Sequence, residues 1–145
     1  MAHVLVVDDS PTIRLTLRSW LEPAGHQVDE AADGAAALAQ LAALPGPLVV
    51  LLDYQMPGLT GFEVLQRALA ERRGPPDYGY VVISAMHGSF PPAFTELLRR
   101  LAIQILPKPF DAETLLAVVD FVARRLEVAA AVRAAATQAD PGRGA

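Results

Sequence analysis

The chain has 145 residues, carries a formal net charge of −4, and 52% of its residues are hydrophobic. This length fits one domain of ordinary size, and the hydrophobic content excludes a disordered chain. The acidic balance argues against a nucleic acid partner, and the lack of cysteine excludes disulfides and thiolate metal sites.

The first half of the chain predicts two strand–helix units. Ser10 followed by Pro11 is typical of a helix N-cap with proline in the first turn, and Asp33 is a second capping residue. In chain order, the predicted elements are a strand at Val4–Val7, a helix at Pro11–Leu21, a strand at Gln27–Ala31 and a helix at Gly34–Ala43.

The second half continues the alternation with three more units. Pro91-Pro92 begins a helix, and Asp111 caps the last one. In chain order, the predicted elements are a strand at Leu48–Leu52, a helix at Gly61–Arg73, a strand at Tyr80–Ile83, a helix ending at about Leu101, a strand at Ala102–Leu106 and a helix ending at about Ala136.

This alternation predicts an α/β fold with a doubly wound, five-stranded parallel sheet in a single domain. The first, third and fourth strands are rich in Val, Leu and Ile with little alternation, which is typical of strands covered on both faces. The tail from about Thr137 is small and polar, and we expect it to fray.

Charged and hydroxyl side chains follow four of the five strands. Asp8 and Asp9 come after the first strand, Asp53 after the third, and Ser84 ends the fourth. Lys108 follows the fifth strand and is the single lysine among twelve basic residues. Because binding crevices of open α/β sheets lie beyond the carboxyl ends of the strands, we expect these side chains to meet there.

Three carboxylates in one place repel unless a cation joins them. A hard divalent ion with oxygen ligands fits this set, and Mg²⁺ suits a site that keeps positions open for phosphate oxygens. A lysine and a hydroxyl opposite the ion would hold further phosphate oxygens. The residues therefore indicate a site that binds, and is able to accept, a phosphoryl group.

The chain resembles the receiver domain of bacterial two-component response regulators, the CheY-like family. The resemblance covers residues 3 to about 125 and rests on four segments in order: HVLVVDDSPTIR, LLDYQMPGLTGFEVL, VISA and LPKPF. It implies a flavodoxin-like strand order of 2-1-3-4-5. It also implies a phosphorylation-dependent signalling protein and not a turnover enzyme.

The resemblance implies a role for each matching residue. Asp53 would accept the phosphoryl group from a sensor histidine kinase. Asp9, Asp53 and the backbone carbonyl of Gln55 would bind Mg²⁺ directly, and Asp8 would act through a bound water. Lys108 would pair with Asp53 and then with the phosphoryl group, Ser84 would bind a phosphoryl oxygen, and the peptide bond before Pro109 would be cis.

The sequence departs from the family pattern near these residues. The aromatic residue usual three positions before the lysine is replaced by Ile105, which puts the family's aromatic switch in doubt. The segment between Ser84 and Lys108 is also unusual, so output contacts are expected to differ. Gln55 and Met86 occupy positions that tune the lifetime of the acyl phosphate, and His87 in the next loop is expected to be solvated.

The last helix outruns the expected domain. At 26 residues it would be about 39 Å long, and we expect a receiver domain at residues 1–125 with a helical extension and tail at 126–145. Its apolar stripe suggests either a homodimer, or another protein contact, or a helix formed by alanine propensity alone. The stripe comprises Leu115, Val118, Val119, Val122, Leu126, Ala129 and Val132.

Three functions remain open at this stage. The first is a stand-alone receiver that contacts a downstream protein or relays phosphate to a histidine phosphotransfer protein, since no helix-turn-helix follows it. The second is a Mg²⁺-dependent aspartyl phosphatase, which Gln55 counts against because such enzymes place an acid there. The third is a degenerate receiver used as a binding module. No signal peptide or membrane span is predicted, so we expect a cytoplasmic protein.

Overall fold

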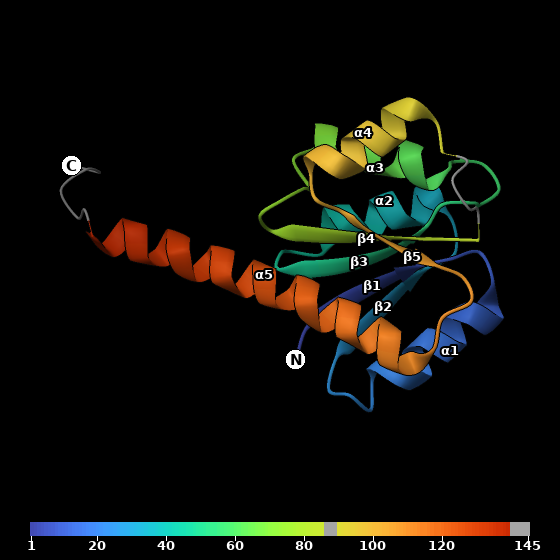
Figure 1. The fold of residues 1–145 in the computed structure, drawn as a ribbon, viewed down its shortest axis with the longest axis horizontal. Coiled ribbons are helices and arrows are strands. Elements are labelled where there is room, and N and C mark those ends of the chain that lie inside the picture. Colours follow the sequence, from blue (N-terminus) through green and yellow to red (C-terminus); the bar gives the residue numbers. More distant parts are fainter. Residues whose placement is uncertain (86–89, 140–145) are drawn as a thin grey trace.

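The computed structural model describes residues 1–85 and 90–139 and forms a three-layer α/β sandwich (Figure 1). Five parallel strands lie in the order β2-β1-β3-β4-β5, as the resemblance implied. The strands are β1 (His3–Val7), β2 (Gln27–Ala31), β3 (Leu48–Asp53), β4 (Tyr78–Ser84) and β5 (Gln104–Pro107). The helices are α1 (Pro11–Leu21), α2 (Gly34–Ala43), α3 (Gly61–Ala70), α4 (Pro92–Arg100) and α5 (Ala112–Ala139).

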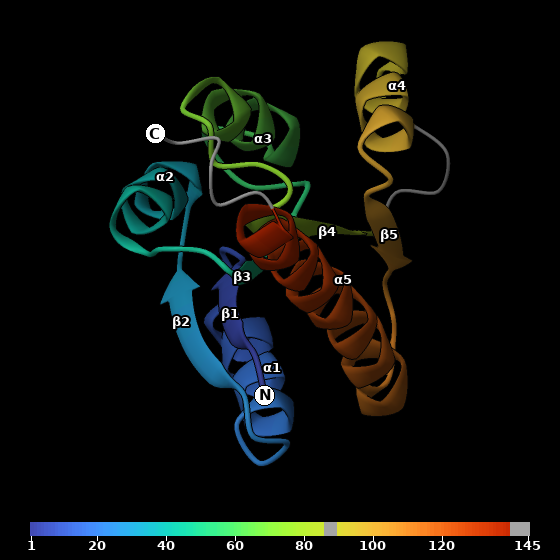
Figure 2. The same ribbon diagram turned by 90° about the vertical axis from the view of Figure 1, so that its left-hand side faces the viewer.

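The helices cover both faces of the sheet (Figure 2). Helices α1 and α5 pack on one face, where Leu17 and Leu115 join the cluster that contains Val6 and Leu51. Helices α2, α3 and α4 pack on the other face, where Phe94 joins the cluster that contains Leu52. Because neighbouring strand residues point to opposite faces, β1 and β3 contribute to both clusters, which explains their unbroken apolar sequences.

The predicted caps at Ser10, Asp33 and Asp111 form, and α3 has a cap at Thr60 that was not predicted. The Ser10 hydroxyl accepts a hydrogen bond from the Ile13 backbone N–H at 3.3 Å, which starts α1 just beyond the end of β1. The Thr60 hydroxyl and the Glu63 carboxylate form a reciprocal capping box that starts α3 just beyond β3. Both helices therefore begin at the edge of the sheet where the predicted site residues lie.

Several predicted boundaries were wrong. Helix α3 ends at Ala70, three residues earlier than predicted, and Arg72 then adopts a left-handed conformation with φ 62°. Strand β5 begins at Gln104, because Ala102 has φ 53° and belongs to the turn that ends α4. Strand β4 begins two residues earlier than predicted, at Tyr78. The turns at Arg72 and Ala102 were not predicted, because residues other than glycine rarely adopt a positive φ.

Helix α5 extends past the sheet, and its described part ends at Ala139, three residues beyond the prediction (Figure 1). The predicted single stripe divides into two parts. Leu115, Val119, Val122 and Leu126 are buried in the core, while Val132 is 61% exposed. The tail at residues 140–145 lies outside the described residues.

Candidate functional site

Three aspartates gather at the carboxyl ends of β1 and β3. These two strands are neighbours, with Val7 paired to Leu52, so the residues that follow them emerge side by side. Asp8, Asp9 and Asp53 each offer a carboxylate oxygen, and these oxygens all lie within 4.8 Å of one another. Asp8 and Asp53 are buried, whereas Asp9 is exposed at the rim of the cluster.

The lysine predicted opposite the acids is in place. The backbone N–H of Lys108 donates to the carbonyl of Ser84 at 2.9 Å, which continues the pairing of β5 with β4. Its ammonium lies 3.4 Å from Asp8 Oδ2 and 3.6 Å from Asp53 Oδ1. Lys108 thus contacts two acids and not Asp53 alone, and its peptide bond to Pro109 is cis, as predicted.

Asp53 lies in an environment that disfavours its charge. The pKa of this carboxyl is raised from its ordinary 3.8 to about 6. Burial is the largest cause, and the charge of Asp8 is the second. The Lys108 ammonium and a backbone hydrogen bond from Gln55 act in the opposite direction without restoring the ordinary pKa. One lysine therefore does not neutralise the cluster.

Gly61 lets α3 start directly against Asp53. Its N–H donates to the Tyr54 carbonyl at 2.9 Å, which closes the loop between β3 and α3. A Cβ atom at this position would lie 2.8 Å from the Asp53 carbonyl oxygen and 2.9 Å from Tyr54 Cα. These atoms belong to the backbone, so a side chain here would displace the strand end that carries Asp53.

The cluster has the composition and size of a magnesium site. All its ligand atoms are carboxylate oxygens, the type that Mg²⁺ prefers. Oxygens that ligate Mg²⁺ at about 2.0–2.1 Å stand roughly 3 to 4 Å apart, so a small contraction of the cluster would surround one ion. The chemistry and spacing of Asp8, Asp9 and Asp53 therefore fit this ion.

The sequence model for the response regulator receiver domain matches residues 4–120. The chain belongs to this family. It is 37% identical to protein PilH of Pseudomonas aeruginosa over 122 residues, which cover 84% of this chain and 98% of PilH. The chain spans only 62% and 25% of two longer curated relatives, at 36% identity in both cases.

Solved receiver structures share the fold. The chemotaxis protein CheY4 of Vibrio cholerae superposes with a TM-score of 0.71 at 31% identity, over 84% of this chain and 98% of CheY4. The response regulator TrrA of Thermotoga maritima, solved in complex with Mg²⁺-BeF, superposes with a TM-score of 0.66 at 28% identity, over 84% of this chain and 99% of TrrA. This is therefore a CheY-like receiver domain of two-component signalling.

The other predicted site residues of this receiver are only partly placed. Ser84 is buried at the end of β4, next to the residue that pairs with Asp53. Gln55 is exposed directly after the β3 end, and its role as a carbonyl ligand stays a prediction. Met86 and His87 lie outside the described residues. Ile105 is 45% exposed on the short β5 strand, so the aliphatic residue at the switch position faces outward.

Sequence reasoning missed one residue that contacts the receiver site. Arg14 Nη1 donates to the backbone carbonyl of Asp8 at 2.7 Å, and Arg14 Nε donates to Glu30 Oε1 at 3.0 Å. The available signal was its place in the first turns of the helix that follows Asp8-Asp9.

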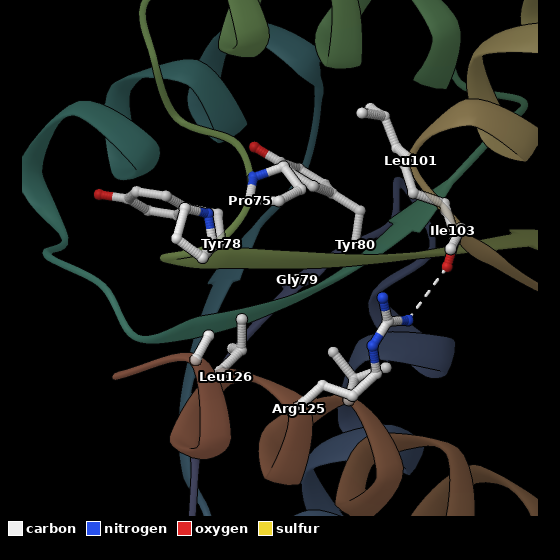
Figure 3. Close-up of a pocket in the computed structure, with 12 residues that line it drawn as sticks. Pro75, Tyr78, Gly79, Tyr80, Leu101, Ile103, Arg125 and Leu126 are labelled. Atoms are coloured by element: carbon white, nitrogen blue, oxygen red, sulfur yellow. Dashed lines mark hydrogen bonds between the residues drawn. The ribbon is translucent and has the colours of Figure 1, made fainter. Parts of the chain in front are cut away.

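A separate small pocket lies at the opposite end of β4 (Figure 3). It has a volume of about 140 Å³, and apolar side chains such as Leu101, Ile103 and Leu126 line it. Its arginine, Arg125, already donates to the Ala102 carbonyl at 3.2 Å. This pocket shares no residue with the acidic cluster.

Among the described residues, no helix combines the length and apolar character needed to cross a membrane.

Proposed function

We propose that this chain is a phosphorylation-dependent switch whose phosphoacceptor is Asp53. The observation that carries the proposal is the convergence of three aspartates and one lysine from three strand ends. Asp53 is the proposed acceptor because it is buried, lies 3.6 Å from the Lys108 ammonium and occupies the acceptor position of the receiver pattern. The match to receiver domains over residues 4–120 supports the same role.

In the proposed reaction, a carboxylate oxygen of Asp53 attacks the phosphorus of a phosphohistidine. A phosphorus–oxygen bond forms, the phosphorus–nitrogen bond breaks, and the imidazole nitrogen keeps the electron pair of the broken bond. Asp53 must be ionised to attack, which its pKa of about 6 permits at neutral pH. Lys108 and Ser84 would stabilise the phosphoryl oxygens as charge moves onto them.

Asp8, Asp9 and Asp53 would hold Mg²⁺, with the Gln55 carbonyl as a further ligand. The ion would supply charge neutralisation between the carboxylates and the incoming phosphoryl oxygens. Lys108 would remain within reach of Asp53 and would move its ion pair from the carboxylates to the phosphoryl group. The positioning of the acceptor and neutralisation of its charge then account for the catalysis that this chain supplies.

Two other functions are weaker. An aspartyl phosphatase needs an acid or base near the nucleophile, and the residue two positions after Asp53 is the exposed amide Gln55. A binding module that is never phosphorylated would not need a buried, destabilised acid at the cluster centre. The raised pKa of Asp53 therefore counts against the binding module, and the amide at Gln55 counts against the phosphatase.

Incubation with Mg²⁺ and acetyl phosphate, followed by intact-mass measurement, tests the proposal. We expect one phosphoryl adduct, lost in Asp53→Asn and when EDTA replaces Mg²⁺. Asp77→Asn is the matched control, because Asp77 is half exposed and pairs with Arg133 away from the cluster. An adduct that persists in Asp53→Asn would refute Asp53 as the acceptor, and absence of any adduct would favour the binding module.

We further propose that residues 1–125 act as the receiver unit and 126–145 as an extension, and that the protein acts in the cytoplasm. Its partners would be a sensor histidine kinase or a histidine phosphotransfer protein, together with a downstream protein target. The similarity to PilH over 98% of its length supports a receiver as the part of the protein that makes these contacts.

A homodimer through α5 is a finer proposal. Phe121, Val128 and Val132 are 50–61% exposed, and their spacing of seven and four places them along one side of the helix. Light scattering on the full chain should show a dimer that Val132→Glu converts to monomer. Ala134→Glu is the control, because it adds the same charge on the other side of the helix. A monomeric wild-type chain would reject the dimer.

A further inference from the structure

Asp8 is held at several points of its backbone and side chain. Its N–H donates to the Ala31 carbonyl at 3.2 Å, and its Oδ1 accepts from the Ser10 N–H at 2.9 Å. Its Oδ2 lies 3.4 Å from the Lys108 ammonium. The remaining group, its backbone carbonyl, accepts the 2.7 Å hydrogen bond from Arg14 Nη1.

That carbonyl belongs to the peptide that joins Asp8 to Asp9. Fixing its direction fixes the plane of this peptide, and the plane sets where the Asp9 Cα and carboxylate begin. Asp9 is exposed, so packing does little to confine it. The position of the Asp9 carboxylate therefore depends on this peptide.

The guanidinium of Arg14 is itself fixed. Its Nε bonds Glu30 Oε1 at 3.0 Å while Nη1 bonds Asp8, and Arg18 Nε holds the other Glu30 oxygen at 2.7 Å. The Arg14 side chain is only 16% exposed. The planar guanidinium has little freedom because it is bonded at two points, to the Asp8 carbonyl just after β1 and to Glu30 in β2. A flexible lysine ammonium would not be held in one orientation in this way.

We propose that Arg14 is a positioning residue for the metal site: anchored on Glu30, it orients the Asp8–Asp9 peptide so that the Asp9 carboxylate faces Asp53. This inference rests on the proposed function, since it concerns how the same cluster holds Mg²⁺. Arg14 does not touch the ion or the phosphoryl group in this role, and it acts through the backbone of Asp8.

The positive charge of Arg14 and its proposed positioning role predict opposite effects of Arg14→Gln on the affinity for Mg²⁺. A cation beside the cluster repels Mg²⁺, so if charge alone mattered, Arg14→Gln would bind Mg²⁺ more tightly than wild type. Positioning predicts weaker binding, by roughly tenfold, as is typical when a residue that supports a metal ligand is lost. Arg14→Lys separates the two further, because it keeps the charge and loses the fork.

The test measures the Mg²⁺ dissociation constant of the full chain by isothermal titration calorimetry. We expect Arg14→Gln to bind roughly tenfold more weakly and Arg14→Lys at least about threefold more weakly than wild type. Arg99→Gln is the control, because it removes one positive charge from an exposed ion pair with Glu96 and contacts neither Asp8 nor Glu30. We expect its dissociation constant to stay within about twofold of wild type.

A second readout separates positioning from a general loss of structure. The rate of adduct formation with acetyl phosphate should fall in Arg14→Lys at low Mg²⁺ and return to the wild-type rate at saturating Mg²⁺. A rate that stays low at saturation would overturn the inference, as would Arg14 variants that bind Mg²⁺ as tightly as wild type. If wild type itself binds no Mg²⁺, the proposed function fails together with this inference.

Discussion

Replacing Asp53 with asparagine is expected to stabilise the protein at neutral pH when Mg²⁺ is absent. The wild-type carboxyl is 4% exposed, and burial and the charge of Asp8 raise its pKa from 3.8 to about 6 despite Lys108. At pH 7 the side chain is therefore ionised in a place that favours its neutral form. Asparagine has nearly the same shape and removes that charge.

The pKa gives both the size and the pH dependence of the effect. The difference between 3.8 and about 6 corresponds to about 3 kcal/mol, at about 1.4 kcal/mol per pH unit. Between these values the folded state binds more protons than the unfolded state, so the wild-type free energy of unfolding falls as pH rises through this window. The gain in Asp53→Asn is thus complete above about pH 6 and vanishes near pH 4.

Urea unfolding in EDTA, followed by circular dichroism at pH 7 and pH 4, measures this difference. Asp77→Asn is again the control, and as a half-exposed acid it should change stability by less than about 1 kcal/mol. Added Mg²⁺ should stabilise wild type and leave Asp53→Asn nearly unchanged, because only wild type offers the carboxylate. The reasoning is refuted if Asp53→Asn is the less stable protein at pH 7, or if its gain is equal at both pH values.

Three further predictions follow from other contacts. Gly61→Ala should destabilise the fold by about 1–3 kcal/mol in urea unfolding and weaken Mg²⁺ binding, because the new Cβ meets the Asp53 carbonyl at 2.8 Å. Leu115→Ala should lower the free energy of unfolding by about 2–5 kcal/mol, because Leu115 is fully buried. Val132→Ala should change the unfolding free energy of the monomer by less than about 0.5 kcal/mol, because Val132 is exposed. Lys108→Gln should raise the pKa of Asp53 further, which carboxyl carbon NMR titration would detect; an unchanged pKa would exclude the ion pair.

The sheet and its acidic edge could be predicted because both depend on local pattern and simple geometry. Runs such as Leu48–Leu52 have no polar side of their own and fit only a sheet that is covered twice. Once such strands are parallel, the residues that follow them share one edge, which places Asp8 near Asp53 without any knowledge of the loops.

The errors have a different physical origin. Ala102 adopts a left-handed conformation, and this allows the Ile103 N–H to bond the Leu98 carbonyl at 2.9 Å as α4 ends. Ile103 also packs against the core, so tertiary contacts offset the local cost of positive φ. An apolar run such as residues 102–106 carries no sign of this turn, and the start of β5 was therefore placed two residues too early.

Arg14 shows a limit of reading site residues by type. Its role depends on a backbone carbonyl and on Glu30 of the neighbouring strand, and neither partner is marked by spacing in the sequence. Aspartates and lysines act through their own charged ends and can be found by position. The place of Arg14 soon after Asp8-Asp9 makes it a candidate, but only the structure shows which backbone carbonyl it bonds.

The charge of the cluster would link phosphorylation of Asp53 to strands β4 and β5 in the proposed switch. At rest the site holds three carboxylates and one ammonium, and burial together with the charge of Asp8 raises the pKa of Asp53. A phosphoryl group on Asp53 would replace the single charge of the carboxylate with about two, a net addition of about one negative charge at the same place. In the proposed switch, Lys108, which follows β5, and Ser84, at the end of β4, would turn toward the phosphoryl group to stabilise this charge. Closing the site around the phosphoryl group would therefore draw on β4 and β5, and the sheet edge that carries the exposed Ile105 is where we expect partners to sense it.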